Sequence, residues 1–170
     1  MKTLFLVRHA KSSWDETSLD DIDRPLKASG VKDAYLISTF LKEKIVQPEL
    51  IISSPAVRAL STAVIFAKGM NIPLTDIKLF QELYESTPGE IQKTIQKTDD
   101  EIDSLMVFGH DPSLTNLFMF LTGINLEKIP TSAVVSISLN IDHWKEIAPG
   151  KGILEYLYKP KQVKAILNLV

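Results

Sequence analysis

The most regular feature of the chain is a series of short apolar runs separated by longer stretches of helical periodicity. Residues 3–7, 50–52 and 104–108 are compact apolar runs, a pattern typical of strands that are buried on both faces. We expect further strands at residues 77–80, 133–139 and 153–158. The last run alternates between apolar and other residues, which predicts a position near an edge of the sheet.

The intervening stretches carry signals for helices. Pro25 opens the first stretch, and before Pro48 closes it apolar and small residues recur at helical spacing, at Val31, Ala34, Tyr35, Ser38, Leu41 and Ile45. A second helix is expected to start with Ser54 as N-cap and Pro55 in the first helical position. Gly69 is expected to follow the end of this helix.

Two later segments also predict helix starts. Residues 87–90 have the sequence of a capping box, and Asp111 followed by Pro112 repeats the pattern of an N-cap and a proline. The helix after Pro112 should end near Gly123. Strands that alternate with helices predict a three-layer α/β/α sandwich with a mostly parallel central sheet. Because no linker or repeat interrupts the pattern, we expect residues 1–170 to form a single domain.

Composition and charge narrow the class of protein. The hydrophobic share of 45% and the charged share of 24% are ordinary for a globular protein. The net charge is −2, so no global positive field would attract nucleic acid, and we expect no such partner. The chain has no cysteine, which excludes disulfides, thiolate zinc sites and phosphatases with a cysteine nucleophile. No signal peptide or membrane-spanning stretch is found, so we expect a cytoplasmic protein without a membrane partner.

Polar side chains follow three of the predicted strands at the point where each strand ends. Arg8 and His9 follow the first strand, Arg58 lies one turn into the helix after the second, and His110 follows the strand at 104–108. Because ligands of open α/β sheets bind at the carboxyl ends of strands, we expect these side chains to meet. Helix N-termini at the same edge and two guanidinium groups would favour a phosphoryl group there.

A neutral imidazole in such a site can act as a nucleophile. His9 would attack phosphorus to form a covalent phosphohistidine, while a backbone carbonyl near residues 10–12 holds its other ring nitrogen. Each of these residues alone is more often a plain loop, helix or cap residue, but their combination at strand ends favours the catalytic interpretation. His143 lies outside this context, and we expect it to be structural or on the surface.

Three segments resemble the histidine phosphatase superfamily, whose fold is called phosphoglycerate mutase-like. They are Leu6–Ala10, Ser53–Pro55 with Arg58 and Ser61-Thr62, and Gly109–Pro112. Within the superfamily, residues 8–14 and residues 23–26 followed by Gly30 are similar to the short SixA-type phosphohistidine phosphatases. The resemblance implies that phosphate is bound by four residues, Arg8, Arg24, Arg58 and His110, and that catalysis uses His9, Arg8, Arg58, His110 and Glu82.

Two of these assignments have an alternative. Arg24 could instead form an ion pair with an aspartate of residues 20–23, but the loop after His9 should fold back over the pocket, which favours phosphate binding. Glu82 stands where superfamily phosphomonoesterases have a general acid, and Glu85 is its rival. A phosphohistidine substrate needs this acid less than an ester does, because a protonated imidazole leaves readily.

The sequence departs from the superfamily at Asp15 and Asp111, where many members have asparagine. A carboxylate near the phosphate would repel it unless it points away. We expect Asp111 to serve as the N-cap of the following helix, and residues 20–23 to form a solvated acidic turn without a metal ion.

The short connections between elements leave no segment for a large lid, which predicts an open cleft. An open cleft would admit a phosphoryl group on a protein surface. The leading hypothesis is a metal-independent and cofactor-free phosphatase that acts on phosphohistidine in a phosphoprotein. The alternatives are a phosphomonoesterase acting on a small phosphorylated metabolite and a phosphate-recognition module that binds without turnover. A mutase is less favoured.

Overall fold

A computed structural model describes residues 1–45 and 47–169, and within these residues six strands form one sheet in the order β3-β2-β4-β1-β5-β6. The strands are β1 Lys2–Arg8, β2 Leu50–Ser53, β3 Ile77–Leu79, β4 Ser104–Gly109, β5 Val134–Leu139 and β6 Gly152–Tyr158. Strands β3, β2, β4 and β1 are parallel, whereas β5 runs antiparallel to both of its neighbours. The expectations of a mostly parallel sheet and of an edge position for the last strand are confirmed.

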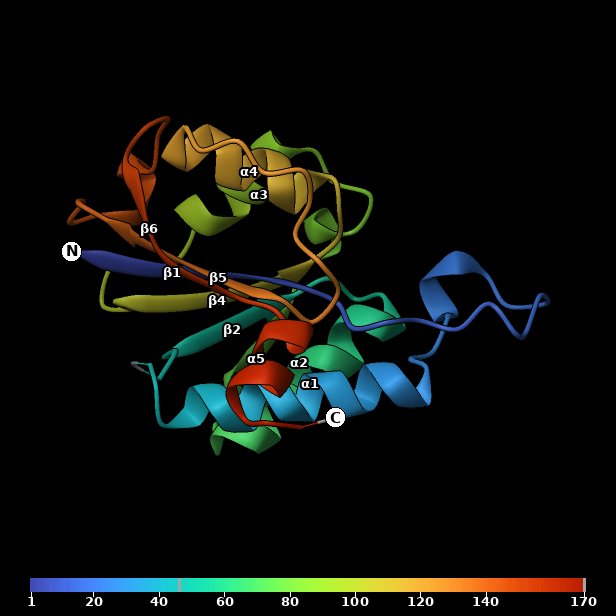
Figure 1. Cartoon of the computed structure of the whole chain (residues 1–170). Helices are drawn as coiled ribbons and strands as arrows, with labels where there is room; N and C mark the ends of the chain where they lie inside the picture. The colour runs from blue at the N-terminus through green and yellow to red at the C-terminus, as the bar shows by residue number, and fades with distance from the viewer. Residues whose placement is uncertain (46, 170) are drawn as a thin grey trace.

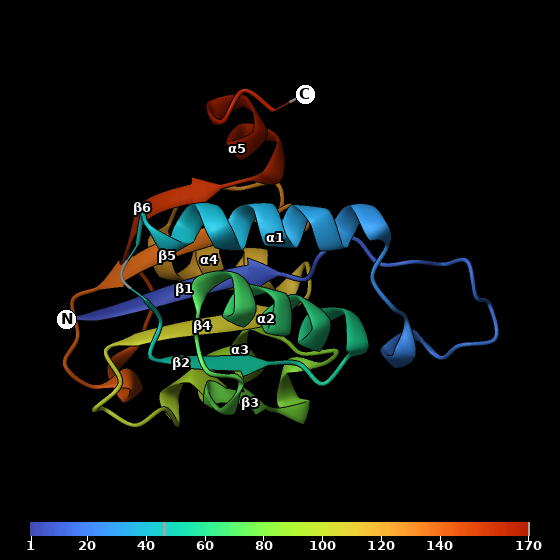
Figure 2. The same cartoon turned by 90° about the horizontal axis from the view of Figure 1, so that it is seen from below.

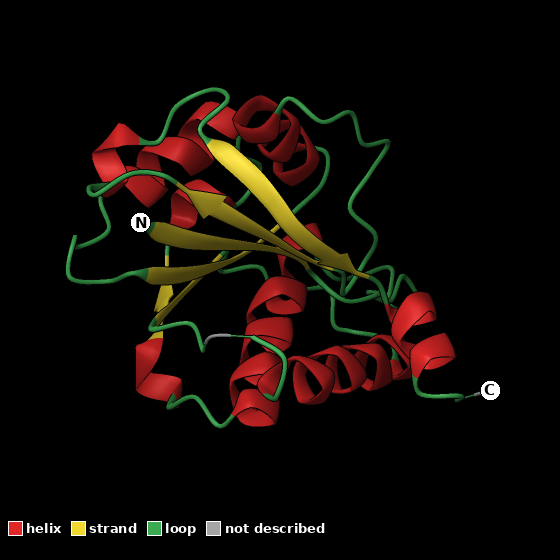
Figure 3. Ribbon diagram, turned by 60° about the vertical axis from the view of Figure 1, so that its left-hand side comes forward, coloured by secondary structure: helices red, strands yellow, loops and turns green. Residues whose placement is uncertain are grey.

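Helices cover both faces of the sheet, which confirms the three-layer architecture (Figures 1 and 3). One face carries α1 Ala28–Lys42, α2 Val57–Met70 and α5 Pro160–Ile166, and the other carries α3 Pro88–Gln96 and α4 Ser113–Thr122. Helices α1 and α2 lie side by side along the sheet (Figure 2). No helix in residues 1–45 and 47–169 is long and apolar enough to cross a membrane.

The two faces of the sheet explain why the central strands are apolar at successive positions. In β1, Leu4 and Leu6 pack into the core on the side of α3 and α4. Phe5 and Val7 pack into the second core, on the side of α1 and α2. A strand covered on both faces buries every side chain, so it has no polar alternation.

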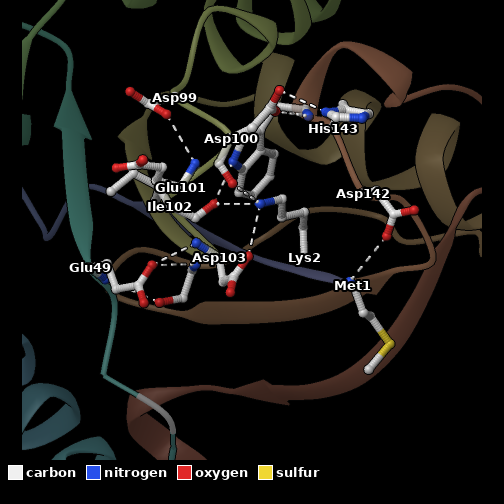
Figure 4. Close-up of polar contacts among 12 residues, drawn as sticks. Met1, Lys2, Glu49, Asp99, Asp100, Glu101, Ile102, Asp103, Asp142 and His143 are labelled. Atoms are coloured by element: carbon white, nitrogen blue, oxygen red, sulfur yellow. Dashed lines mark hydrogen bonds and ion pairs between the residues drawn. The ribbon is translucent and has the colours of Figure 1, made fainter.

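Polar contacts connect the chain segments at the end of the sheet where β1 and β4 begin, opposite the predicted site (Figure 4). The buried Lys2 donates to the Ile102 carbonyl at 3.0 Å and to Asp103 Oδ1 at 2.8 Å. Asp100 Oδ2 lies 2.8 Å from Nδ1 of His143. The other carboxylate oxygen, Oδ1, accepts a hydrogen bond from the Trp144 backbone N–H. His143 therefore lies on the surface and contacts Asp100, within the expectation of a structural or surface residue.

The start and end of α2 differ from the expectation. The helix begins at Val57, so Ser54 is not its N-cap and Pro55 precedes it. The Ser54 hydroxyl instead accepts from the Ala56 N–H at 3.2 Å, which closes the turn between β2 and the helix. At the other end the helix runs through Gly69, and Asn71 adopts the left-handed conformation with φ 58°.

Helix α4 also begins later in the chain than the sequence predicted. The helix begins at Ser113 with Pro112 at the N-cap position, so the prediction of Asp111 as N-cap is wrong. The Asp111 carboxylate accepts instead from the Thr115 hydroxyl at 2.8 Å, one turn into the helix. Gly123 ends α4 with φ 72°, and Thr87 starts α3 in a complete capping box, as the sequence predicted.

The first helix, α1, begins at Ala28, three residues after Pro25. Residues 25–27 pair instead with the outgoing part of the same loop: Ser13 N–H donates to the Pro25 carbonyl and Lys27 N–H to the Lys11 carbonyl, each at 2.8 Å. The loop between β1 and α1 therefore returns to the end of β1 before the helix starts. This loop extends beyond the sheet edge in Figure 2.

Candidate active site

A cavity of about 410 Å³ lies at the carboxyl ends of the parallel strands. Its lining includes five residues that the sequence singled out: Arg8, His9, Arg24, Arg58 and His110. Lys11, Ser12, Trp14, Lys27, Asp111 and Thr131 complete the lining. The structure thus brings together residues from the ends of β1 and β4, the β1–α1 loop, α2 and the segment before β5.

The His9 ring is held in one orientation by its own loop. Nδ1 lies 2.7 Å from the Ala10 carbonyl oxygen, within the segment where a backbone acceptor was expected. Burial lowers the pKa of His9 to about 4, and the positive charges of Arg58 and Arg8 act in the same direction. The ring is therefore neutral at physiological pH, with Nδ1–H donating to the carbonyl. Nε2 then carries the free lone pair, which is the form that can attack phosphorus.

The backbone on either side of His9 is fixed by neighbouring elements. The Thr62 hydroxyl accepts from the Ala10 N–H at 2.9 Å and donates to the Arg58 carbonyl at 2.6 Å. The His9 N–H donates to the Gly109 carbonyl at 3.2 Å. Thr62 therefore couples the loop after β1 to the turn of α2 that carries Arg58, so the histidine and the arginine are positioned together.

His110 lies beside His9, with 5.3 Å between the ring centroids. Its Nε2 is 2.9 Å from the Ser54 hydroxyl. Burial lowers the pKa of His110 to about 3, and the charge of Arg58 contributes. His110 is therefore neutral near pH 7 and can serve as a hydrogen-bonding group rather than as a cation.

The carboxylate of Asp21 binds both Arg24 and Arg58, the two cavity arginines that do not belong to β1. Asp21 Oδ2 accepts from Arg58 at 3.0 Å and from the Tyr84 hydroxyl at 2.6 Å, and Oδ1 accepts from Arg24 at 2.9 Å. The Tyr84 hydrogen bond, followed by the two guanidinium groups, lowers the pKa of Asp21 to about 2. Arg24 thus both lines the cavity and forms the aspartate ion pair considered for it, with a side chain only 8% exposed.

Arg24 is also held by the loop it belongs to. Its Nε donates to the Ser13 carbonyl at 3.1 Å, and its guanidinium lies over the Trp14 ring, 3.2 Å from the centroid. The loop can approach α1 closely because residue 30 is glycine: a Cβ there would overlap the Lys11 carbonyl. The loop thus returns to the cavity and brings Arg24 to its wall, while the contact of Arg24 with phosphate stays a prediction.

Arg8 also lines the cavity and is held by other residues. It donates to the Ile129 carbonyl at 3.0 Å, and the same nitrogen lies 3.9 Å from Asp111 Oδ2. Asp111 therefore lines the cavity, but its charge is balanced by Arg8 and by the hydrogen bond from Thr115. Asp15, the other departure from the superfamily pattern, is exposed and does not line the cavity.

The structure does not bring Glu82 into this set. Glu82 lies in the short 3-10 helix Gln81–Leu83, where its carboxylate is 3.8 Å from Lys97 Nζ and its side chain is 52% exposed. Neither Glu82 nor the exposed Glu85 lines the cavity. In the described part of the chain, no three histidine, aspartate or glutamate side chains are grouped so that they could hold a metal ion.

Sequence reasoning assigned no role to Thr62 and Tyr84. It considered Asp21 only as one of the aspartates of residues 20–23 that could form an ion pair with Arg24, and did not connect it to Arg58. Thr62 was part of the motif Ser61-Thr62, but its spacing of four residues from Arg58 is also the ordinary spacing of a helix. Tyr84 is 63 residues from Asp21 in the chain, and only the tertiary fold places its hydroxyl there.

Known proteins share both the sequence pattern and the fold. Residues 4–106, more than half of the chain, match the family model described as histidine phosphatase superfamily (branch 1). The phosphohistidine phosphatase SixA of Escherichia coli (strain K12) is 28% identical over 172 residues, which cover 96% of this chain and 99% of that protein. An uncharacterized protein of Mycobacterium tuberculosis (strain ATCC 25618 / H37Rv) is 28% identical over 165 residues, which cover 91% of this chain and 100% of that protein.

Solved structures extend the likeness to three dimensions. The protein histidine phosphatase SixA complexed with tungstate has a TM-score of 0.82 and 25% identity, covering 95% of this chain and 99% of that chain. An alpha-ribazole phosphatase of Shigella flexneri has a TM-score of 0.68 and 16% identity, covering 93% of this chain and 96% of that chain. The second match shows the shared fold alone.

Proposed function

Because the chain belongs to the histidine phosphatase superfamily and is a phosphatase with a histidine nucleophile, we propose that His9 is this nucleophile and that the substrate is phosphohistidine in a protein. The observation that carries the first assignment is the state of the His9 ring. The ring is neutral, its Nδ1 is anchored on the Ala10 carbonyl, and it opens into a cavity that also contains three arginines.

In the first step, the lone pair on His9 Nε2 attacks phosphorus. The bond between phosphorus and the substrate imidazole nitrogen breaks, and its electron pair stays on that nitrogen. The leaving imidazole keeps the proton on its other nitrogen and departs as a neutral ring. The Ala10 carbonyl holds Nδ1–H of His9 throughout, so the ring cannot turn away from the phosphoryl group.

In the second step, a water oxygen attacks the phosphoryl group on His9. The phosphorus–nitrogen bond breaks, its electron pair returns to Nε2, and inorganic phosphate forms while the proton of the water passes to solvent. During both steps negative charge lies on the equatorial oxygens of the phosphoryl group, and Arg8, Arg24 and Arg58 supply fixed positive charge for it. The proposal therefore includes no metal ion or other cofactor.

The position of Glu82 supports a phosphohistidine substrate. An alkyl ester needs a proton donor for its leaving oxygen, and the glutamate considered for that task forms an ion pair with Lys97 outside the cavity. A protonated phosphohistidine ring already carries the proton that makes it a good leaving group. The name of the Escherichia coli relative, a phosphohistidine phosphatase, points to the same substrate class.

Phosphate release tests the proposal. Wild type and His9→Ala would be compared in EDTA on a phosphohistidine protein and on p-nitrophenyl phosphate. We expect wild type to hydrolyse the phosphohistidine protein and His9→Ala to be inactive while remaining folded. Hydrolysis by His9→Ala would contradict the role of His9. Hydrolysis of the aryl ester alone would contradict the phosphoprotein substrate and favour a small-molecule phosphomonoesterase.

A further inference from the structure

A second cavity opens next to the active site. It measures about 620 Å³, and Lys11 and Thr131 line both cavities. Beyond these shared residues it is bordered by Lys159, Lys161 and Lys164, and we call this second cavity the lysine groove. A ligand whose phosphoryl group lies at His9 could therefore continue over Lys11 and Thr131 into the lysine groove.

The strand order explains why lysines from the end of the chain border a groove that adjoins the active-site cavity. In the sheet, Val134 of β5 pairs with Val7 of β1 on one side and with Tyr158 of β6 on the other. Strand β6 is antiparallel to β5, so it runs in the direction of β1 and ends at the same edge of the sheet. Lys159 follows Tyr158 directly, and α5, which contains Lys161 and Lys164, lies beyond β6 and next to α1 (Figure 2).

The lysine groove is positively charged although the whole chain is not. Lys11, Lys159 and Lys161 are exposed and form no ion pair with any residue in 1–45 or 47–169. The acidic side chain of the lining is Asp33, which is buried and accepts from Lys164 at 2.7 Å. Because the net charge of the protein is −2, these lysines form a local feature and do not reflect a generally basic surface.

The rest of the lining favours a peptide over other anionic ligands. Pro130 and Leu169 add apolar surface to the lysine groove, whose volume is on the scale of a few side chains. A membrane or a nucleic acid would be recruited by a broad basic face, and the net charge of −2 opposes both. A short acidic segment would pair its carboxylates with the free ammonium groups and place its aliphatic parts against Pro130 and Leu169.

We propose that the lysine groove binds an acidic segment of the phosphoprotein whose phosphohistidine enters the active site. This proposal rests on the proposed function, because it assigns part of the same substrate to the lysine groove. It makes the lysines determinants of which phosphoproteins are hydrolysed efficiently. It leaves the chemical step at His9 unchanged.

The first test uses two synthetic peptides that each carry one phosphohistidine, flanked on both sides by four glutamates in one peptide and by four glutamines in the other. Exposed ion pairs are individually weak, so three lysines together should give the glutamate peptide an advantage in kcat/KM of about tenfold at low salt. The variant Lys159→Glu/Lys161→Glu should lose or reverse this advantage. Its hydrolysis of free phosphohistidine should equal that of wild type, because neither residue lines the active-site cavity.

A matched control carries the same change of charge at the opposite edge of the sheet. Lys145→Glu/Lys151→Glu alters two exposed lysines near the start of β6 and should keep the wild-type preference. Circular dichroism would verify that both double variants are folded. Equal kcat/KM values for the two peptides with wild type, or an unchanged preference in Lys159→Glu/Lys161→Glu, would overturn the proposal.

The second test separates docking from catalysis. Fluorescence anisotropy would measure binding of the unphosphorylated glutamate and glutamine peptides to the same proteins. We expect wild type to bind the glutamate peptide about tenfold more tightly, with the difference decreasing as salt is raised. Absence of this difference, or stronger binding to vesicles rich in phosphatidylserine than to the peptide, would overturn the docking proposal. Failure of wild type to hydrolyse any phosphohistidine substrate, with peptide binding intact, would contradict the proposed function only.

Discussion

Asp21 binds Arg58 through both its backbone and its side chain: the guanidinium donates to the Asp21 carbonyl oxygen at 2.7 Å and to Oδ2 at 3.0 Å. Asp21 belongs to the loop between β1 and α1, whereas Arg58 lies in the first turn of α2. The pair therefore connects two elements that wall the active-site cavity. The same carboxylate also holds Arg24 and Tyr84, so two of the three arginines that line the cavity share one anchor.

Asp21→Asn is expected to lower kcat/KM for phosphohistidine substrates by about tenfold. The amide keeps the size of the side chain but removes its charge, and charge-assisted hydrogen bonds contribute roughly 1.5–3 kcal/mol when shielded from water. Because the Asp21 side chain is 43% exposed, the lower end of that range applies, which is about one factor of ten. Steady-state kinetics would measure the loss.

Tyr84→Phe provides the graded comparison for Asp21→Asn. It removes one hydrogen bond to the Asp21 carboxylate and leaves both ion pairs in place. Its effect on kcat/KM should therefore be smaller than that of Asp21→Asn. Wild-type kinetics in Asp21→Asn would show that Arg24 and Arg58 do not depend on this anchor.

The neutral state of His9 has a consequence for stability in acid. Burial lowers the pKa of His9 to about 4 in the folded protein, from 6.5 for an unperturbed ring. Between these pH values the unfolded chain binds a proton that the folded chain does not, so the free energy of unfolding decreases as the pH falls from 6.5 toward 4. His110, whose pKa is lowered to about 3, acts in the same direction.

Urea unfolding at pH 7, 6 and 5 would measure this dependence. The free energy of unfolding of wild type should fall between pH 7 and pH 5, and that of His9→Ala should fall less, because one of the two buried rings is gone. If the free energy of unfolding fell by the same amount with pH in both proteins, His9 would have an ordinary pKa in the folded state.

Thr62→Val should reduce both stability and activity. Valine keeps the shape of the side chain but leaves the buried Ala10 N–H and the Arg58 carbonyl without their shared partner. An unsatisfied buried hydrogen-bonding group costs roughly 1–3 kcal/mol, which should appear as a lower free energy of unfolding in urea. The turnover number should fall as well, because Ala10 supplies the carbonyl that orients His9.

Thr62→Ser separates the hydroxyl from the methyl group. Serine can make both hydrogen bonds, so it should retain most of the turnover number while losing only the packing of one methyl. If Thr62→Ser were as impaired as Thr62→Val, the hydrogen bonds would not be what positions His9.

Glu82→Gln should leave hydrolysis of phosphohistidine within about twofold of wild type, as expected for a surface charge that contributes little. The carboxylate is half exposed and lies beside Lys97, outside the cavity. Arg58→Ala should by contrast reduce kcat on the order of 100-fold, comparable to the loss of one oxyanion donor. Steady-state kinetics of both variants on a phosphohistidine substrate would test these predictions. A tenfold loss of kcat in Glu82→Gln would restore Glu82 as the general acid.

The sequence predicted the parts of the site that depend on regular structure. His9 and His110 could be placed at one edge because β1 and β4 are uninterrupted apolar runs, and the residues after parallel strands share an edge. Arg58 followed from the short turn between β2 and α2. The sequence did not reveal that Asp21 holds both arginines, because its position depends on how a loop of nearly twenty residues returns to β1.

The errors in the helix starts have a related cause. Serine or aspartate before proline is a local signal for an N-cap, yet Ser54 and Asp111 use their side chains for contacts with His110, Thr115 and Arg8. Residues near an active site thus satisfy the tertiary contacts of the site before the local preference of the helix. The assignment of Glu82 has a different origin: it rested on the resemblance to superfamily phosphomonoesterases, whereas this chain places Glu82 beside Lys97, outside the cavity.

Gly30→Ala is expected to disturb the site without changing any residue that lines it. A Cβ at position 30 would overlap the backbone carbonyl of Lys11, and a backbone atom cannot move aside as a flexible side chain can. Overpacking of this kind costs roughly 1–3 kcal/mol, so the midpoint of urea unfolding should decrease. The loop should also shift away from α1, which moves Arg24 relative to His9 and raises KM for phosphohistidine substrates. Gly89→Ala is the control, because a Cβ there would meet only the Thr87 hydroxyl, at 4.0 Å. It should not lower the midpoint or change KM, and an equal loss in both variants would show that the close approach of Lys11 to Gly30 has no special role in holding the loop.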